Sequence, residues 1–476
     1  SQQLPKQLIP IMSISEPTIQ PTNGSDSATA MTNGAASGAA TPGIYDRRES
    51  EVRSYCRSWP TEFVSATGST QTDTAGRTYI DFFAGAGALS YGHNHPVIKE
   101  ALIEFLAGDG VMHSLDTHTT TKRTFLETFE RLVLEPRGLD YKVMFPGPTG
   151  TNAVESALKL ARKATGRDSI ISFTNAFHGM TLGSLAITGN AVKRSGAGVP
   201  LTNTVAMPFD SYVTDDSVDT IAFLDQYLTD GGSGVGLPAA CILETVQAEG
   251  GINPASVRWI QRLAELCREH GILLIIDDIQ VGCGRTGPFF SWEEMGIEPD
   301  IVCLSKSISG SGLPLALVLI KPRYDVWEPG EHNGTFRGNN SAFVTGTAAL
   351  EHFWADDELT KQVDAKAALV TKHLEALAEA HPGVFEDVRG RGLIQGIECL
   401  DPEMAGRIAA EAFDRGLLIE TAGFNSQVVK ILPPLVIATE LLEAGLHILE
   451  ASVEAVVDAE SAELLTRDPQ TIGDRS

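Results

Sequence analysis

The sequence has few cysteines and no long apolar run. Its 476 residues hold six cysteines without a Cys-x-x-Cys pair, so we expect free thiols in a reducing compartment rather than a disulfide framework. A membrane-crossing helix needs roughly 18 consecutive apolar residues, and no such run occurs. The first residues lack a basic segment followed by an apolar stretch, so no secretory signal is predicted. These features predict a cytoplasmic protein that does not enter a membrane.

Basic residues are also scarce. The chain has 36 Lys and Arg against 61 Asp and Glu, a formal charge of −25. Such a balance argues against nucleic acid or an anionic membrane as the main partner. With 42% hydrophobic and 20% charged residues, the composition is that of a globular protein. Its length allows two domains or one large α/β body.

Residues 1–43 carry few charges and no aromatic side chain, and they are rich in small polar residues. Such a segment buries too little apolar surface to offset the entropy lost on ordering. We therefore predict a disordered tail, with structure beginning near Ile44.

Between residues 141 and 321 the sequence alternates strand-like and helix-like segments. The expected strands are Lys142–Phe145, Asp168–Phe173, Ala240–Glu244, Gly271–Asp278, Ile301–Leu304 and Leu315–Ile320. The expected helices are Asn152–Ala164 and a segment opened by Pro254, followed later by Glu358–Ala380 and Met404–Arg415, with a strand at Val428–Leu432. Unbroken apolar strands between helices indicate a mostly parallel sheet that is buried on both faces.

Ligands of such a sheet bind beyond the carboxyl ends of its strands, where four segments carry polar or aromatic side chains. Gly150 and Thr151 open a helix, so their bare N–H groups and the Thr151 hydroxyl suit a phosphate, although a plain capped helix is the alternative. No Gly-Lys-Ser/Thr follows, so this is not a nucleotide P-loop. Phe177 could stack on a planar ring or belong to the core.

Two charged residues follow buried strands. Asp277 needs a partner there, which could be a cationic cofactor nitrogen, a metal, a helix terminus or a salt bridge. Lys306 could be a desolvated amine that forms a Schiff base, or a solvated loop residue. Taken together, a phosphate cradle, a stacking aromatic, a carboxylate and a lysine meet the requirements of pyridoxal phosphate.

Several motifs resemble class III (subgroup II) aminotransferases in the right order. These are Thr149–Arg162, Phe177–Gly179, Glu244–Gly251, Asp277–Gly287 with Lys306, Gly334–Phe336 and Arg389–Gly392. The resemblance implies an α/β fold of the fold-type I transferases that use pyridoxal 5'-phosphate. It places a large cofactor-binding domain at residues 113–344. A smaller α+β domain would comprise residues 44–112 and 345–465, and residues 466–476 would form a tail.

The same resemblance implies a role for each site residue. Lys306 would hold the cofactor and then move the proton, and Asp277 would keep the pyridine nitrogen protonated. Gly150 and Thr151 would bind the phosphate, Phe177 would stack on the ring, and Gln280 would bind its phenolic oxygen. Thr335 would reach the phosphate from a neighbouring subunit, which implies at least a homodimer. Glu244 would border the substrate space, with Glu249 as a possible gate.

A narrower set of segments is similar to the members that act in ectoine biosynthesis. They are Glu49–Arg57, Asp81–Gly87, Tyr91–Pro96, His113–Asp116 and Thr335–Asn340. These members move the amino group of L-glutamate to L-aspartate 4-semialdehyde, giving L-2,4-diaminobutyrate and 2-oxoglutarate. Where ornithine-type relatives present an arginine to the substrate carboxylate, this chain has Lys430, which lacks the bidentate fork. Either Lys430 or Arg337 is therefore expected to hold that carboxylate.

Other functions are open on the sequence alone. An acetylornithine-, ornithine- or 4-aminobutyrate-type aminotransferase would share most of these motifs, and diaminobutyrate could instead supply a siderophore or a peptide antibiotic. His93 and His95 could join Asp277 and Asp278 in a metal-dependent hydrolase, but His-Asn-His-Pro favours a turn, so no metal is predicted. A cofactor-binding regulator without turnover is disfavoured by the absence of a DNA-binding segment and by the acidic charge.

Overall fold

The computed structural model describes residues 43–215 and 218–466. The predicted tails at 1–43 and 466–476 lie outside this range except for their innermost residues. The chain forms two compact units, one ending at Arg53 and the other starting at Ser54. In the first unit, helix α1 (Ile44–Arg48) precedes Arg53, which pairs with Asp46 at 2.9 Å.

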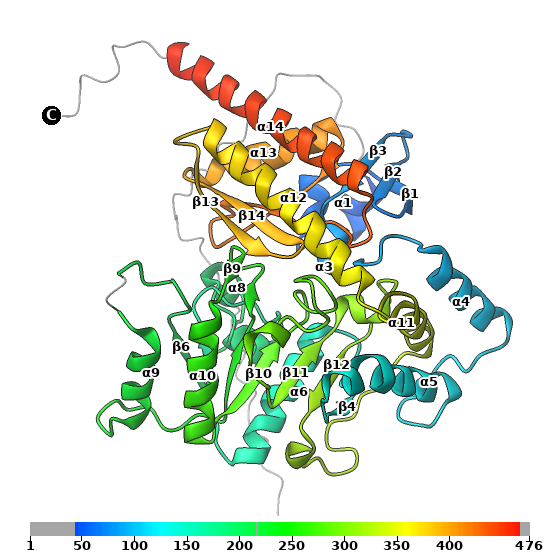
Figure 1. The fold of residues 1–476 in the computed structure, drawn as a ribbon, viewed down its shortest axis with the longest axis vertical. Helices are drawn as coiled ribbons and strands as arrows, with labels where there is room; N and C mark the ends of the chain where they lie inside the picture. Colours follow the sequence, from blue (N-terminus) through cyan, green and yellow to red (C-terminus); the bar gives the residue numbers. More distant parts are fainter. Residues whose placement is uncertain (1–42, 216–217, 467–476) are drawn as a thin grey trace, which may run out of the picture. The chain divides into compact units, whose positions relative to one another are not determined.

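A seven-stranded sheet is the centre of the second unit (Figure 1). Its order is β4 (Lys142–Met144), β12 (Leu317–Ile320), β11 (Ile301–Leu304), β10 (Leu273–Asp277), β7 (Ala240–Leu243), β5 (Ile170–Phe173) and β6 (Thr204–Met207). The five strands from β11 to β6 are parallel, and β12 runs antiparallel to both of its neighbours. The prediction of a mostly parallel sheet is confirmed.

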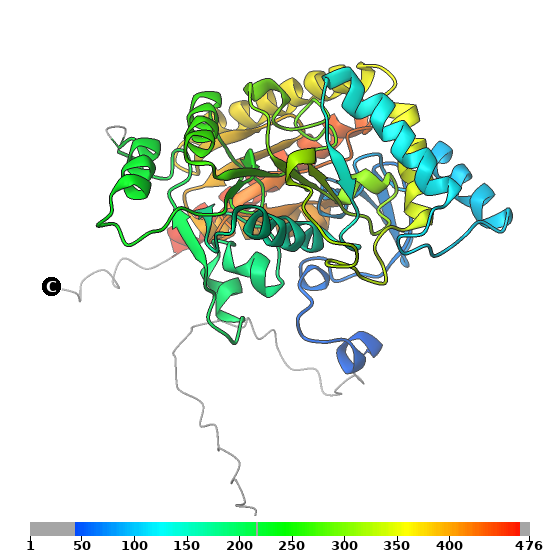
Figure 2. The same ribbon diagram turned by 90° about the horizontal axis from the view of Figure 1, so that it is seen from below.

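Alternating side chains of β10 bury both faces of this sheet. Leu273 and Ile275 pack in one cluster with helix α6 (Gly150–Thr165), while Leu274 and Ile276 pack in another with helix α10 (Val257–His270). Figure 2 shows α6 in teal and α10 in green on opposite sides of the strands. Two-sided burial explains why these strands read as unbroken apolar runs.

The predicted start of the second helix was wrong. Pro254 lies in the short strand β9 (Asn253–Pro254), and α10 begins at Val257. Ser256 is the N-cap, because its side chain accepts the Trp259 N–H. A serine at this position satisfies a free backbone donor, which proline at the same place cannot do.

The C-terminal part builds a second sheet and its helical cover. Its order is β13 (Phe385–Arg391), β14 (Ile394–Cys399), β17 (Val428–Ile431) and β16 (Glu420–Ala422). Helices α12 (Glu358–Ala380), α13 (Pro402–Arg415) and α14 (Thr439–Thr466) lie over it in Figure 1. The predicted helices and strand in this part are confirmed.

A third sheet joins distant parts of the chain. It contains β1 (Phe63–Thr67), β2 (Thr70–Asp73), β3 (Thr78–Asp81) and β15 (Leu417–Leu418), with β3 and β15 parallel. The remaining α-helices and strands are α2 (Tyr55–Ser58), α3 (Ala84–Gly87), α4 (Pro96–Ala107), α5 (Thr120–Phe129), α7 (Leu182–Ala186), α8 (Ala191–Ser195), α9 (Thr220–Thr229), β8 (Val246–Gln247) and α11 (Asn340–Phe353). Within the described ranges, none of the helices combines the length and apolar character needed for a membrane crossing.

Candidate active site

Residues at or after the C-terminal ends of four neighbouring strands of the central sheet line one cavity. Lys306 follows β11, Asp277 ends β10, Glu244 follows β7 and Phe177 follows β5, and these strands are adjacent in the sheet. The cavity has a volume of about 170 Å³. Its lining comprises Gly150, Thr151, Phe177, His178, Gly179, Glu244, Glu249, Asp277, Ile279, Gln280 and Lys306. The structure thus brings together residues that the sequence places more than a hundred positions apart.

Lys306 sits at a strained point of the backbone. Its φ is 54°, a left-handed value that costs free energy for any residue except glycine. Burial lowers the pKa of its ammonium group to about 8, and the nearby positive charge of Lys430 adds to that effect. A lysine with such a pKa is partly neutral near physiological pH, so it can act as a nucleophile or a base.

Asp277 is held in place from two sides. Its Oδ2 lies 2.7 Å from the His178 Nδ1 atom, and its Oδ1 accepts the Ile279 N–H at 3.2 Å. Burial disfavours the charged imidazole, but hydrogen bonding and charge from Asp277 outweigh it and raise the pKa of His178. The other ring atom, His178 Nε2, is buried without a hydrogen-bond partner in the described chain.

Glu244 supports the loop that carries the aromatic ring. Its carboxylate accepts the backbone N–H groups of Phe177 at 2.9 Å and Ala248 at 3.2 Å. Burial raises the pKa of Glu244 to about 7. The side chain therefore holds Phe177 against the cavity while its own charge depends on pH close to neutrality.

The start of α6 forms the opposite end of the cavity. Thr149 and Asn152 make the capping box, which leaves the Thr151 hydroxyl for contacts with Thr181 at 2.7 Å and Ser184 at 2.9 Å. A Cβ atom on Gly179 would lie 2.5 Å from the Thr151 Oγ1 atom, so only glycine fits there. Hydroxyls and free N–H groups at a helix N-terminus provide donors for an anion.

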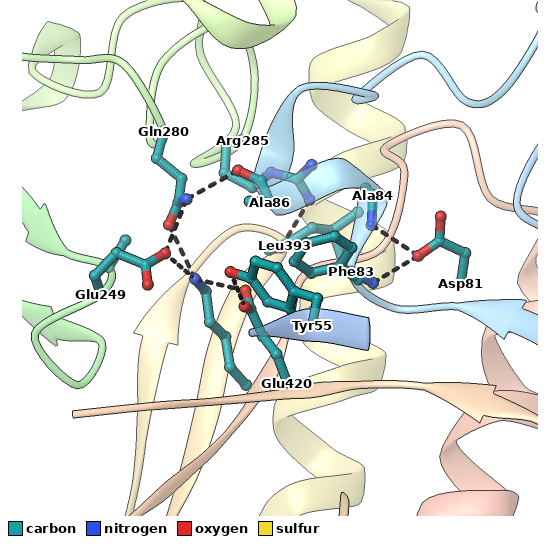
Figure 3. A network of polar contacts seen from close by, with 12 residues as sticks. Tyr55, Asp81, Phe83, Ala84, Ala86, Glu249, Gln280, Arg285, Leu393 and Glu420 are labelled. Carbon is teal, nitrogen blue, oxygen red and sulfur yellow. Dashed lines mark hydrogen bonds and ion pairs between the residues drawn. The ribbon is translucent and has the colours of Figure 1, made fainter. Parts of the chain in front are cut away.

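Lys430 lies in a network of polar contacts, and Figure 3 labels its partners Glu249, Gln280 and Glu420. Its buried Nζ atom lies 2.8 Å from Glu249 Oε1, 2.9 Å from Glu420 Oε1 and 3.0 Å from Gln280 Oε1. Tyr55 donates to the other oxygen of Glu420 at 3.2 Å, and Gln280 Nε2 donates to Glu249 at 3.2 Å.

Glu249 and Glu420 both contact Lys430, but their pKa values shift in opposite directions. Burial alone would raise the pKa of Glu249, but the charges of Lys430 and Lys306 prevail and lower it. For Glu420, burial prevails over the charge of Lys430 and raises the pKa. Lys430 itself has a raised pKa because both carboxylates outweigh its burial. The lysine is thus a firmly charged ammonium already shared by two acidic groups.

Three residues proposed from the sequence do not line this cavity: Lys430, whose contacts are given above, Thr335 and Arg337. Thr335 is exposed in the loop before α11, and Arg337 lies 3.8 Å from Asp116 in the same region. In the described ranges, no group of three or more histidine, cysteine or acidic residues could hold a metal ion. His93 instead contacts Asp81 at 2.7 Å.

Sequence reasoning missed the roles of several residues. His178 was part of a motif, but nothing in the sequence paired it with Asp277. Glu420 and Tyr55 gave no signal, because they meet Lys430 only through the pairing of β16 with β17 and the fold of α2. Arg285 is fully buried and donates to the Leu393 carbonyl at 3.0 Å, a contact that the sequence could not show.

Comparison with known proteins gives this arrangement a family. Residues 56–453 match the model of the aminotransferase class-III family. The chain belongs to this family. Its fold is therefore that of the fold-type I enzymes, and its cofactor is pyridoxal 5'-phosphate. The expectations for family, fold and cofactor are confirmed.

The most similar relatives and structures agree with this assignment. The chain is 59% identical over 414 residues to the diaminobutyrate–2-oxoglutarate transaminase of Virgibacillus pantothenticus, covering 87% of this chain and 99% of the relative. It is 59% identical over 411 residues to the enzyme of that name from Streptomyces coelicolor, covering 86% and 97%. The ornithine aminotransferase of Toxoplasma gondii superposes with a TM-score of 0.76 at 26% identity, covering 87% of this chain and 94% of that one.

Proposed function

We propose that this protein transfers the amino group of L-glutamate to L-aspartate 4-semialdehyde, giving L-2,4-diaminobutyrate and 2-oxoglutarate. The observation that carries this proposal is the 59% identity to a diaminobutyrate–2-oxoglutarate transaminase across almost the whole of both chains. An ornithine- or 4-aminobutyrate-type reaction is less well supported, because the solved ornithine aminotransferase is only 26% identical.

The residues of the cavity fit pyridoxal phosphate. The buried pair of His178 and Asp277 presents a fixed carboxylate where a protonated ring nitrogen needs a partner. Thr151 and the α6 N-terminus offer donors to a phosphate, and Phe177 and Gln280 line the space between these two ends. When bound, the cofactor supplies an electron sink that stabilises the carbanion left by proton loss from the substrate.

Lys306 moves the proton in this proposal. The pKa of its ammonium group is lowered to about 8, so part of the lysine is a neutral amine near physiological pH. The neutral Nζ atom takes a proton from the reacting carbon and returns it in a later step. Asp277 is held by His178 and the Ile279 N–H, and its carboxylate would pair with the ring nitrogen of the bound cofactor. Glu244 borders the substrate space and holds the backbone of Phe177.

The α-carboxylate of glutamate, next to the reacting carbon, requires a cation. Lys430 could serve if Glu249 moved away and acted as a gate, since Glu249 lines the cavity and is the more exposed of its two carboxylate partners. Arg337 is the second candidate. Since Arg337 and Thr335 do not line the cavity of their own chain, we place both at the site of a second subunit, which makes the active enzyme at least a homodimer.

The place of the reaction in metabolism follows from its product. Diaminobutyrate is a precursor of ectoine, and we propose this route ahead of siderophore or antibiotic supply because the narrower sequence match is to ectoine enzymes. All six cysteines are free thiols, which fits a reducing cytoplasm.

A half-reaction screen tests the proposed function. The purified holoenzyme is first loaded with the amino group of glutamate and then discharged with aspartate 4-semialdehyde, glutamate 5-semialdehyde or succinate semialdehyde, the last two being the aldehydes of the ornithine- and 4-aminobutyrate-type reactions. We expect discharge to be fastest with aspartate 4-semialdehyde. Faster discharge with one of the other two aldehydes would assign the protein to that activity instead.

A further inference from the structure

The cofactor cavity shares lining residues with a small hollow, which in turn shares lining residues with a larger space. This outer chamber has a volume of about 610 Å³ and is bordered by Tyr55, Asn190, Lys193, Glu249, Glu420 and Phe424. The small hollow, called the constriction here, has a volume of about 20 Å³ and shares Asn190, Lys193, Glu249 and Phe424 with the outer chamber. Phe177 lines both the constriction and the cofactor cavity, and Glu249 lines all three spaces. A substrate that reaches Lys306 by this route passes these two side chains.

Lys193 supplies a positive charge at the constriction. It belongs to helix α8, where the Asn190 side chain accepts its backbone N–H. Its Nζ atom lies 4.3 Å from the centre of the Phe177 ring, and it lines both the constriction and the outer chamber. Among the residues that the structure describes, no carboxylate forms an ion pair with it. Lys430 differs, because two carboxylates already neutralise it.

The two amino donors of the proposed reaction share one feature that such a cation could read. In glutamate, two carbon atoms separate the reacting carbon from the side-chain carboxylate. In diaminobutyrate, two carbon atoms likewise separate the reacting C4 from the C1 carboxylate. When the reacting carbons of both molecules occupy the same point above Lys306, their distal carboxylates therefore reach the same place. A single cation can serve both half-reactions.

We propose that Lys193 binds this shared distal carboxylate and thereby selects the amino group at C4 of diaminobutyrate. This inference rests on the proposed function. With the carboxylate held by Lys193 at the constriction, the chain of the substrate extends past Phe177 and presents C4 to Lys306. The C2 ammonium group, next to the carboxylate, stays near Glu249, whose negative charge stabilises it.

The experiment compares amines that differ only in the carboxylate. Holoenzyme half-reactions are followed spectroscopically for two pairs of amines, diaminobutyrate with 1,3-diaminopropane and glutamate with 2-aminobutyrate. The second amine of each pair lacks the distal carboxylate. The variants are Lys193→Met and Lys193→Arg. Lys372→Met, which removes an exposed lysine on α12, is the control with the same change of net charge.

Loss of a charge-assisted contact is worth roughly 10- to 100-fold in kcat/KM. We expect Lys193→Met to lower kcat/KM by that factor for diaminobutyrate and for glutamate, mainly by raising KM. The kcat/KM values for the two truncated amines should stay within about twofold of wild type. Lys193→Arg should retain most of the preference for the amines with the carboxylate, and Lys372→Met should change nothing.

Equal losses of kcat/KM for full-length and truncated amines, or no loss, would overturn the inference. Wild-type enzyme that reacts with glutamate but not with diaminobutyrate would refute the proposed function, while the glutamate pair would still decide the role of Lys193.

Discussion

The His178 Nδ1 atom lies 2.7 Å from the Asp277 Oδ2 atom, and both side chains are buried. The pair fixes the carboxylate at the floor of the cavity and balances part of its charge. A carboxylate buried without this partner would be poorly solvated and less firmly oriented. The orientation of the Asp277 carboxylate therefore depends on His178 as well as on the end of strand β10.

Replacing His178 tests this relationship. His178→Phe keeps a ring of similar size but removes the hydrogen bond, so we expect kcat to fall by roughly 10- to 100-fold, the worth of a charge-assisted hydrogen bond. KM should change little. His178→Asn, which can still donate to Asp277, should recover part of the loss. Equal activity of the two variants would contradict a role through Asp277. Steady-state kinetics and the absorption spectrum of the bound cofactor provide the readouts.

The lowered pKa of Lys306 predicts a pH dependence. Only the neutral amine attacks an aldehyde, and its fraction rises with pH until the pKa of about 8 is passed. The rate of cofactor loading onto apoenzyme should thus rise to a plateau just above pH 8, after correction for the reaction of N-acetyl-lysine ester in the same buffers. An unshifted lysine, with a pKa of 10.5, would show a rate that climbs steadily to pH 10.

The two carboxylates around Lys430 predict a stability effect. Lys430→Met would leave Glu249 and Glu420 buried together without a cation, which should cost about 3–5 kcal/mol of unfolding free energy. Adding Glu420→Gln removes one of the two stranded charges and should restore at least about 1 kcal/mol of that loss. Urea unfolding of the wild type, both single variants and the double variant gives the coupling energy. Strictly additive effects would contradict the network.

A related effect of pH follows from Glu420. Its pKa is raised in the folded state, so the folded protein binds this proton more tightly than the unfolded chain does. The contribution of Glu420 to stability is therefore present below the unfolded pKa and is lost as the pH rises through the raised folded value. In Glu420→Gln this loss should vanish, so the difference in unfolding free energy between variant and wild type should shift in favour of the variant with rising pH. A difference independent of pH would contradict this reading.

Most of the central sheet could be predicted from the sequence because strands buried on both faces appear as unbroken apolar runs. The apolar run of β10 and the aspartate that ends it predicted both the strand and the site residue. The direction of β12 could not be predicted, since an apolar run reads the same in either direction. The start of α10 was misplaced because proline is typical of a first helical turn, whereas the helix begins after its N-cap, Ser256.

The site was predictable only in part for a different reason. Lys306 and Asp277 stand at strand ends, a local property, whereas the partners of Lys430 come from other segments. Glu249 is 181 positions away in the sequence, and Glu420 is opposite Lys430 because β16 pairs with β17. Only the folded chain shows that both carboxylates share its charge. A lysine that the sequence presents as free to receive a substrate carboxylate is in the structure already paired.

The transfer of nitrogen from a chosen position tests the central claim most directly. L-2,4-Diaminobutyrate labelled with ¹⁵N only at the 4-amino group is incubated with the holoenzyme and unlabelled 2-oxoglutarate, and the glutamate formed is examined by mass spectrometry. We expect the glutamate to carry the label. Unlabelled glutamate, which would mean transfer from C2, or no glutamate at all, would contradict it.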